Sequence, residues 1–515
     1  MTFNSEEIIR DVRAEFEKLL EYVTGEKAHQ AQADSIERGL FKMLLSMGAK
    51  LLQLFFVMRS QACSREAFQD KDAQELPYHH DSGRVYFSIF GKVLIERPYF
   101  YAPGAAGRTP LDADLGLGDD SYSDLLREVT EYLAIYHVYG GKSADFLERL
   151  LGLKLSTRAL RQNIAEDSVS VAEYYAQKSP PKPESESEIL VIQADGKGIP
   201  MVLEEDEVPE TPVRLGKGQK HGHKKEAIVT TVYTIAANPR SASDVIASFF
   251  EENQAENMPK KVSQPQNKHM WATLDGKDAA LARLSIQVAL RQGQHIQHRV
   301  ALCDGCEALQ SRIALQFQHF ILILDFVHAN EYLWDAANSL LGETSQKRLE
   351  WVKSRTCQIL SGETTQVISE LRSLAQTKKM KVSQRKQLEK TTNYFERNLP
   401  YMDYQTYLSN GYPIASGVIE GACRHFVKDR FELSGMRWLQ TGAENLLRLR
   451  AVAENADWDQ YFAFHREKRQ LRLYGLPASN AHPIESLVIN SQSEILRQPT
   501  TFSSHSKRSS LPLAV

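Results

Sequence analysis

The spacing of apolar residues divides the chain into a helical front, a pair of strands and a longer part where strands and helices alternate. In the first sixty residues, apolar side chains recur three and four positions apart, which predicts an amphipathic helix. Its apolar members are Leu40, Met43, Leu44, Met47, Leu51 and Leu54. We expect this stripe to pack into the core, and pairing with a second copy of the chain is the alternative.

Apolar residues then occupy every second position on both sides of Phe90-Gly91-Lys92. This alternation predicts a β-hairpin that ends at Arg97-Pro98. Helical spacing returns from Ser123 to Gln177. The polar, proline-rich segment 178–188 then breaks the pattern and is the clearest domain boundary in the chain.

Within that helical stretch, residues 143–162 predict two helices separated by a turn at Gly152, with Ser156 capping the second helix. This is the pattern of a helix-turn-helix. The second helix would present Arg158 and Arg161, residue types that suit phosphate groups and base edges. A plain helical hairpin without a DNA-binding role fits the pattern equally well.

Strands alternate with helices after the linker, which predicts an α/β domain. We expect strands over 189–192, 226–235, 298–303 and 320–324. The segment from Asn330 to Asn398 has helical spacing throughout and carries an excess of Lys and Arg.

The composition is that of an ordinary globular protein: 515 residues, 42% hydrophobic and 25% charged. It excludes collagen, mucin-like and wholly disordered chains, and the length predicts more than one domain at ~150 residues each. The net charge of −3 argues against a uniformly basic DNA-binding protein, but the charge is segregated. An acidic loop at 204–210 stands apart from two basic segments, for which we predict phosphate contacts rather than a merely solvated surface. Their basic residues are Lys217, Lys220, Lys224, Lys225, Lys378, Lys379 and Lys381.

Cysteine usage and hydropathy favour a reducing compartment. Five cysteines in a chain of this length cannot form a disulfide scaffold, and the N-terminus has no signal-peptide pattern. The most apolar run, Leu51 to Met58, is far shorter than the ~20 residues of a membrane helix. We therefore expect a soluble cytoplasmic protein. Cys303 and Cys306 form a single pair, so we expect buried thiols rather than a zinc site.

Three acidic residues stand in settings that suit catalysis. Asp195 and Asp304 each follow a predicted buried strand, whose carboxyl end is where α/β proteins bind ligands. Ser416 is a plausible N-cap that places Glu420 one turn into a helix. Clustered carboxylates suit Mg²⁺, and two such ions ~3.5–4 Å apart can clamp the oxygens of a phosphodiester displacement. The alternative for each aspartate is an ordinary Asp-Gly turn, as at Asp275-Gly276.

These segments together resemble a known family. Residues 416–430 with Gly435-Met436-Arg437-Trp438, the Asp195-Gly196-Lys197-Gly198 block, residues 216–226 and Asp304-Gly305 are similar to blocks of bacterial insertion-sequence transposases of the Kra group. Asp325-Phe326-Val327-His328 resembles the C/D-x-x-H signature of the wider Mutator-like set. The resemblance extends from about 189 to 438.

The resemblance implies a DDE transposase with an RNase H-like catalytic core of mixed α/β class, split by an all-α insertion. Asp195, Asp304 and Glu420 would bind two Mg²⁺ ions, with Mn²⁺ as a substitute, and Asp325 and His328 would be auxiliary. The partners would be double-stranded DNA, as terminal inverted repeats and target, and further copies of the chain in a dimer or larger assembly. Such an enzyme would work in the bacterial cytoplasm, at the nucleoid when bound to DNA.

The helix that carries Glu420 adds two further candidates. Arg424 and Lys428 lie four and eight residues after Glu420, so an α-helix would place all three on one face. We predict that both cations contact DNA, with ordinary surface charge as the alternative. Two other functions remain open from the sequence: an RNase H-like nuclease or resolvase, and a catalytically dead DNA-binding protein derived from a transposase.

The expected organisation has seven parts. A DNA-binding front precedes the core, and a helical insertion divides the core in two. The parts are an N-terminal helical region (1–75), the hairpin and helix-turn-helix (76–177), the linker (178–188), the first part of the core (189–334), the insertion (335–409), the C-terminal core helices (410–470) and a mostly disordered tail (471–515).

Overall fold

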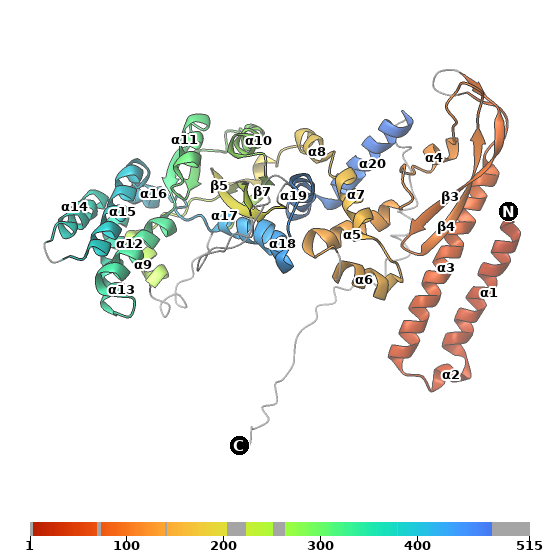
Figure 1. Cartoon of the computed structure of the whole chain (residues 1–515), viewed down its shortest axis with the longest axis horizontal. Coiled ribbons are helices and arrows are strands. Elements are labelled where there is room, and N and C mark those ends of the chain that lie inside the picture. The colour runs from red at the N-terminus through yellow and green to blue at the C-terminus, as the bar shows by residue number, and fades with distance from the viewer. Residues whose placement is uncertain are drawn as a thin grey trace, which may run out of the picture.

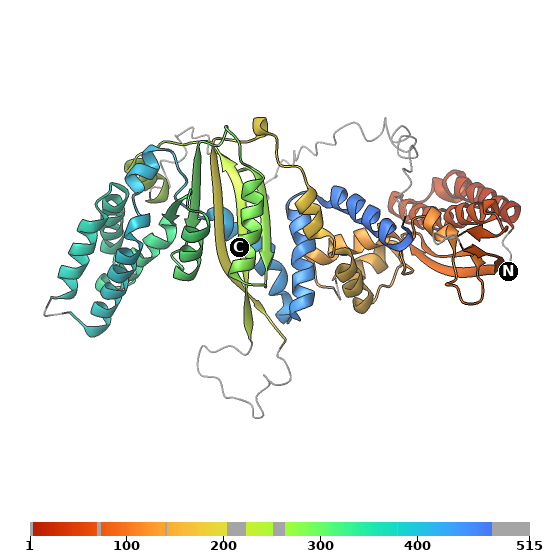
Figure 2. The same ribbon diagram turned by 90° about the horizontal axis from the view of Figure 1, so that it is seen from above.

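The computed structural model describes residues 4–69, 74–139, 142–202, 223–250, 263–377 and 380–475. They form an elongated molecule with a β-sheet near its middle (Figure 1). Two long helices and a hairpin occupy one end, and a group of helices occupies the other. The view from above shows the same order of parts (Figure 2).

The front begins with a pair of helices that packs on the predicted hairpin. The elements are α1 (Ser5–Thr24), α2 (Glu26–His29), α3 (Ala33–Ala62), the short pair β1 (Phe68–Gln69) and β2 (Glu75–Leu76), and the hairpin β3 (Tyr78–Ser88) and β4 (Gly91–Phe100). The predicted hairpin is confirmed. The predicted apolar stripe is only partly a core stripe: Met43, Met47 and Leu54 are half-buried, whereas Leu44 and Leu51 are exposed.

By length and composition alone, α3 is long and apolar enough to cross a membrane. The expectation from the shorter run Leu51–Met58 missed this, because that run is only part of an apolar helix interrupted by Lys42 and Lys50. Little of the most apolar stretch of α3 is buried inside the chain.

The predicted helix-turn-helix secondary structure is confirmed. The helices of this part are α4 (Pro110–Asp114), α5 (Asp124–Tyr136), α6 (Lys142–Leu151), α7 (Thr157–Asp167) and α8 (Val171–Gln177). Gly152 has a φ of 69°, a left-handed conformation that suits glycine and ends α6. The Ser156 hydroxyl accepts a hydrogen bond from the Ala159 amide at 3.1 Å and so caps α7. Buried Arg127 on α5 pairs with Asp167 on α7 at 2.6 Å.

The central sheet has five strands in the order β7-β6-β5-β8-β9. Strands β5, β6 and β7 are antiparallel neighbours, whereas β8 and β9 run parallel to β5. Helices connect several of these strands, so the predicted α/β alternation is confirmed. The elements are β5 (Ile189–Pro200), β6 (Lys224–Ile235), α9 (Ala242–Phe250), β7 (Gln266–Thr273), α10 (Lys277–Ala289), β8 (His298–Cys303), α11 (Glu307–Gln316) and β9 (Ile321–Leu324).

The two faces of the sheet are covered by different helices. Helices α10 and α11 close one face over Ile192 and Ala301. The opposite face packs Val191 and Val300 into a core shared with the helices that follow β9. These are α12 (Phe326–Leu341), α13 (Lys347–Leu360), α14 (Thr364–Ala375), α15 (Val382–Asn398) and α16 (Tyr404–Ser409). The helical prediction for 330–398 is confirmed, and the expected boundary at 334–335 falls inside α12.

The last described helices return to the sheet and then to the front. They are α17 (Gly417–Ala422), a π-helical segment (Cys423–Lys428), α18 (Asp429–Phe431), α19 (Gln440–Glu454) and α20 (Trp458–Tyr474). On α20, Arg469 pairs with Asp124 at 2.5 Å and Tyr474 donates to the Leu117 carbonyl at 2.7 Å. The C-terminal helices therefore join the sheet to the helix-turn-helix region. The tail was predicted to begin at 471, but α20 continues to Tyr474, and only the part of the tail from 476 onward lies outside the described residues.

Candidate functional site

Strand register places Asp195 and Asp304 side by side. The last parallel pair between β5 and β8 is Gln193 with Leu302, and each aspartate lies two residues beyond it. Because side chains alternate along a strand, the Asp195 carboxylate lies on the face that Gln193 occupies, and Asp304, in the turn directly after β8, is close enough for its charge to act on Asp195. The expectation that the first strand ends before Asp195 is wrong: β5 continues to Pro200, because its antiparallel pairing with β6 persists.

The Asp195 carboxylate is half-buried and has two hydrogen-bond donors. Its Oδ1 accepts from the Gly196 amide at 2.6 Å, and its Oδ2 accepts from the Cys423 thiol at 3.3 Å. Burial is the largest cause of a raised Asp195 pKa, and the nearby charge of Asp304 raises it further. A bound cation would oppose both effects.

Asp304 lies in a turn that a distant helix fixes. Its Oδ1 accepts from the Cys306 amide at 2.9 Å, while Tyr394 on α15 donates to its backbone carbonyl at 3.0 Å. Gly305 has a φ of 83°, and a Cβ there would lie 2.5 Å from the Tyr394 hydroxyl. The turn therefore requires glycine for two reasons, its conformation and the close approach of Tyr394.

Asp325, His328, Ser416 and Glu420 form a second group at this edge. Asp325 is fully buried and caps α12 by accepting from the Val327 amide at 2.8 Å. His328 Nδ1 lies 2.9 Å from Asp325 Oδ2, and this hydrogen bond is the main reason that the His328 pKa is raised to about 9. His328 is thus positively charged at neutral pH, beside Asp325.

Ser416 connects Asp325 to Glu420. Its hydroxyl contacts Asp325 Oδ2 and also lies 3.1 Å from Glu420 Oε1. It therefore does not cap α17 with its side chain, although the residue occupies the predicted N-cap position. A hydroxyl has one proton, so it can donate to only one of these two carboxylates. Asp325 already has His328 as a partner, so Glu420 is the carboxylate that a cation would complete.

The oxygen donors of this edge fit a hard divalent cation. Asp195, Asp304 and Glu420 form no ion pair with any residue that the structure describes. Asp325, His328 and Glu420 offer ligand atoms that all lie within 4.8 Å of one another, the single group of this kind among the described residues. The predicted triad is not such a tight group. Glu420 lies closer to the two auxiliary residues than the prediction implied, and the metal roles stay predictions.

A π-helical segment follows Glu420 and places Cys423 against Asp195. Buried Cys423 holds a raised pKa because of its burial and the Asp195 charge, so it is a protonated donor. The predicted face shared by Glu420, Arg424 and Lys428 assumed a continuous α-helix, and the i→i+5 bonds of the π segment change that spacing. Arg424 and Lys428 are both exposed. Segments of this kind are frequent at functional sites.

The predicted DNA-binding residues do not form one patch. Arg158 and Arg161 are exposed on α7, and Lys381 is exposed at the start of α15, on the other side of the sheet (Figure 1). Lys224 pairs with Glu432, and Lys225 donates to Gln440 at 2.7 Å, which ties β6 to the C-terminal segment. Lys217, Lys220, Lys378 and Lys379 lie outside the described residues.

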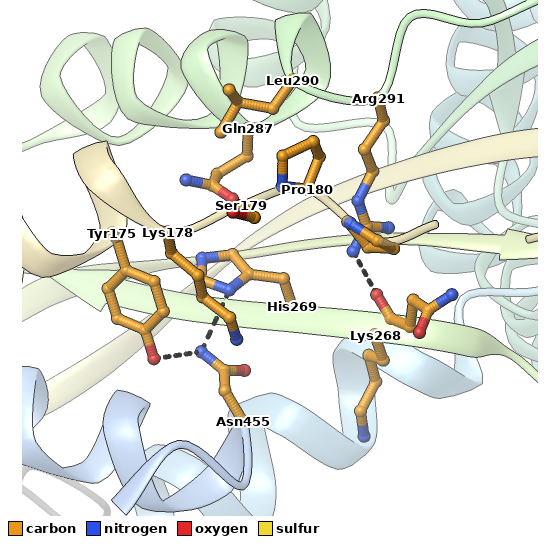
Figure 3. A pocket seen from close by; sticks show the side chains of 12 residues that line it. Tyr175, Lys178, Ser179, Pro180, Lys268, His269, Gln287, Leu290, Arg291 and Asn455 are labelled. Carbon is orange, nitrogen blue, oxygen red and sulfur yellow. Dashed lines mark hydrogen bonds between the residues drawn. The ribbon is translucent and has the colours of Figure 1, made fainter. Parts of the chain in front are cut away.

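A hollow of about 270 Å³ lies at the linker and not at the carboxylates (Figure 3). Lys178, Lys268 and Arg291 contribute positive charge to its lining. Asn455 donates to the Tyr175 hydroxyl at 3.0 Å and to His269 Nδ1 at 3.1 Å, as the dashed lines in the figure show. These bonds fasten α8 to β7 where the linker begins, so the hollow marks a structural junction.

Sequence reasoning missed several residues that shape the sheet edge with Asp195, Asp304 and Glu420, which we call the carboxylate edge. Cys303 was expected to be merely a buried thiol, yet it lies 3.5 Å from Asp304 Oδ1, and no role was predicted for Cys423, which donates to Asp195. Cys306 is only partly buried. Ser416, four residues before Glu420, carried a signal, because serine at that spacing was already identified as a cap. Tyr394 had none.

Comparisons with known proteins add little to this geometry. No protein-family model matches the chain, and no curated protein matches it. A solved structure, the "Drosophila P element transposase strand transfer complex", aligns with 72% of this chain and 86% of its own at 9% identity, with a TM-score of 0.22. A TM-score this low carries no argument about fold or function. Membership of the Kra group therefore stays a prediction.

Proposed function

We propose that this protein is a DNA transposase of the DDE type with an RNase H-like core. The observation that supports this most is the meeting of Asp195, Asp304 and the Glu420 helix at one sheet edge. Two strands in matched register supply the aspartates. The helix reaches them through Cys423, which contacts Asp195, and through Ser416, which joins Glu420 to Asp325.

Each carboxylate would have a defined part in holding the metal. Asp195 and Asp304 are the two ligands on the sheet, and Glu420 is the ligand from the helix. Bound Mg²⁺, or Mn²⁺ in its place, would stabilise negative charge on the phosphodiester and activate water. Asp325 and Ser416 orient Glu420, and charged His328 offsets part of the negative charge of the group.

The proposed reaction has two displacements. Water attacks a phosphodiester at the element end and releases a 3′-hydroxyl. That hydroxyl then attacks a phosphodiester of the target, forms the new strand junction and displaces the target's own 3′-oxygen. Exposed Arg424 and Lys428 flank the carboxylates and would contact the DNA backbone, as would Arg158 and Arg161 on α7.

The decisive experiment is a strand-transfer assay in Mg²⁺ with a duplex that carries the inverted repeats flanking the gene. We expect joined products from the wild-type chain and none from Asp195→Asn, Asp304→Asn or Glu420→Gln. Asp275→Asn is the matched control, because Asp275 also precedes a glycine after a strand but is exposed at a different turn. Cleavage without joining would indicate a nuclease, and DNA binding without either would indicate a dead enzyme.

A further inference from the structure

Helix α3 has two covered faces. Along one of them it packs antiparallel to α1, where Lys50 pairs with Glu15 at 2.7 Å and the Tyr22 hydroxyl donates to the Ser35 carbonyl at 2.9 Å. Along the next face it packs on β4, where Gln53 exchanges two hydrogen bonds with the Leu94 backbone at 2.6 and 2.9 Å.

The third face of α3 is apolar and exposed. Five exposed apolar residues of α3 lie three, seven, four and three positions apart along the chain. Three exposed apolar residues of the neighbouring α1 lie four and three positions apart and extend the same surface. Their side chains are between 37% and 51% exposed, and no residue of α1 is fully buried. The set, which we call the front face, is Phe16, Leu20, Val23, Phe41, Leu44, Leu51, Phe55 and Met58.

Helical phase places all eight side chains on one side of the helix pair. On α1 the exposed positions 16, 20 and 23 each follow a half-buried position by one residue. On α3 the exposed positions 41, 44, 51, 55 and 58 each follow a half-buried or buried one. One residue further along each helix, the side chain points 100° away from the half-buried position before it. In an antiparallel pair, this rotation carries the side chains of both helices toward the same side of the pair.

The area of the front face fits a protein interface. Eight large side chains, each nearly half exposed, offer roughly 600 Å² per chain, close to the roughly 800 Å² that each partner contributes to a stable complex. A patch of this size is at the upper end of what monomeric proteins expose, and such patches are often functional.

The charges beside the front face are complementary to a second copy of the same face. Exposed Glu17 and Glu21 border it on α1, and exposed Lys42 borders it on α3. A two-fold axis along the helices brings α1 of one chain opposite α3 of the other at the same height. Glu21 of each chain would then face Lys42 of its partner, and the two helix pairs would form a four-helix bundle.

A lipid bilayer is a poorer occupant of this face. Helix α1 accompanies α3 along its length and carries Glu6, Arg10, Glu17 and Glu21 on exposed positions. Burying these charges at the depth of the apolar stripe would cost several kcal/mol each. A second helix pair would cover the apolar side chains and leave those charges at its border.

We infer that the front face binds the front face of a second copy of this chain and forms a two-fold dimer. This inference rests on the proposed function in one respect: a dimer is what would hold two element ends together. Dimer formation itself requires neither DNA nor metal. A measurement of mass without DNA therefore tests the dimer, whereas the strand-transfer assay tests the proposed chemistry.

The test is the mass of the full chain in solution without DNA, measured by light scattering and sedimentation at micromolar concentration. We expect twice the chain mass of 58.3 kDa for the wild type. Leu44→Glu with Phe55→Glu should give 58.3 kDa with unchanged circular dichroism. The control replaces two more exposed apolar residues elsewhere, Ile286→Glu with Leu315→Glu, and should stay dimeric.

A charge exchange separates the two-fold arrangement from nonspecific association. Lys42→Glu should weaken the dimer at least tenfold, and Lys42→Glu combined with Glu21→Lys should restore it. Three results would overturn the inference: a monomeric wild type, a dimer that persists in Leu44→Glu with Phe55→Glu, or no rescue by the exchange. Flotation of the wild type with phosphatidylcholine or phosphatidylglycerol vesicles, lost in the same variant, would identify a membrane face instead.

Discussion

The carboxylate edge of the sheet and the front face of the helix pair leave opposite kinds of group unsatisfied. At the sheet edge, Asp195 is half-buried near Asp304, and burial first and the Asp304 charge second raise the pKa of Asp195. At the front, side chains such as Leu44 and Phe55 are left in water. Both arrangements cost stability in the isolated chain, and the two proposals assign each a partner, a cation with DNA in one case and an apolar surface in the other.

The two regions also differ in how they are supported. The carboxylate edge is fixed by contacts from remote segments, among them Tyr394 to the Asp304 carbonyl and Ser416 to Asp325. The front face follows from the helical periods of α1 and α3 and from the packing of α1 and β4 on the other faces of α3. Substitutions at the sheet edge should therefore act through geometry, whereas substitutions at the front should act through exposed apolar area and bordering charge.

The largest effect is expected from a substitution of Asp195, which should change activity and stability in opposite directions. Asp195→Asn should lower strand transfer on the order of 10³-fold, or about 4 kcal/mol, because a metal ligand is lost. The same change should raise the melting temperature of the metal-free protein, because burial and Asp304 already disfavour the charged form of Asp195. Calorimetry in EDTA, beside the joining assay, checks both. A lower melting temperature would contradict this account of the charges.

The next effect tests the turn at Asp304. Gly305→Ala should destabilise the protein by roughly 2–4 kcal/mol, since the alanine Cβ meets the Tyr394 hydroxyl and the backbone φ of 83° disfavours it. Urea unfolding measures the loss. Gly276→Ala is the matched control, because Gly276 has a φ of 92° but a Cβ at that position would have nothing within 4 Å. An equal loss in both variants would mean that Tyr394 contributes nothing.

A smaller effect concerns Ser416 as a positioning residue. Ser416→Ala should reduce strand transfer roughly 10–100-fold by releasing Glu420 from Asp325. The diagnostic readout is the Mg²⁺ concentration for half-maximal activity, which should rise, whereas Ser416→Thr should largely restore it. Unchanged Mg²⁺ dependence in the alanine variant would assign Ser416 a purely structural role.

The smallest effect is the pH dependence from His328. Its folded pKa of about 9 lies above the ordinary value of 6.5, so its stabilising contribution is complete below about pH 6.5 and is lost as the pH rises through 9. With His328 partly exposed, we expect on the order of 1 kcal/mol after solvent screening. Urea unfolding in EDTA at pH 6 and pH 9.5 measures it. The His328→Gln variant should lose this part of the dependence.

The sequence predicted the features that depend on neighbours along the chain. The β3–β4 hairpin, the turn at Gly152 and the Ser156 cap all follow from local spacing and turn chemistry. The candidate carboxylates were also located from the sequence, because aspartate beside a buried strand is a local pattern. Their metal-binding roles came from a family resemblance and await the joining assay.

The features that it did not predict depend on segments far apart in the chain. Strand β5 passes through Asp195 because β6 continues to pair with it. The Ser416 hydroxyl accepts no hydrogen bond from the start of α17, and it donates instead to Asp325 on another element.

Periodicity alone determined that α3 is an apolar helix and that Asp195 and Asp304 stand beside strands. Only the tertiary structure decided which sides of α3 are covered. Helix α1 packs on one face and β4 on the next, and the third face stays exposed. The tertiary structure also decided that the ligand atoms of Glu420, Asp325 and His328 lie within 4.8 Å of one another. Helical and strand periods report how a segment presents its side chains, whereas the partners of those side chains are set by packing between distant segments.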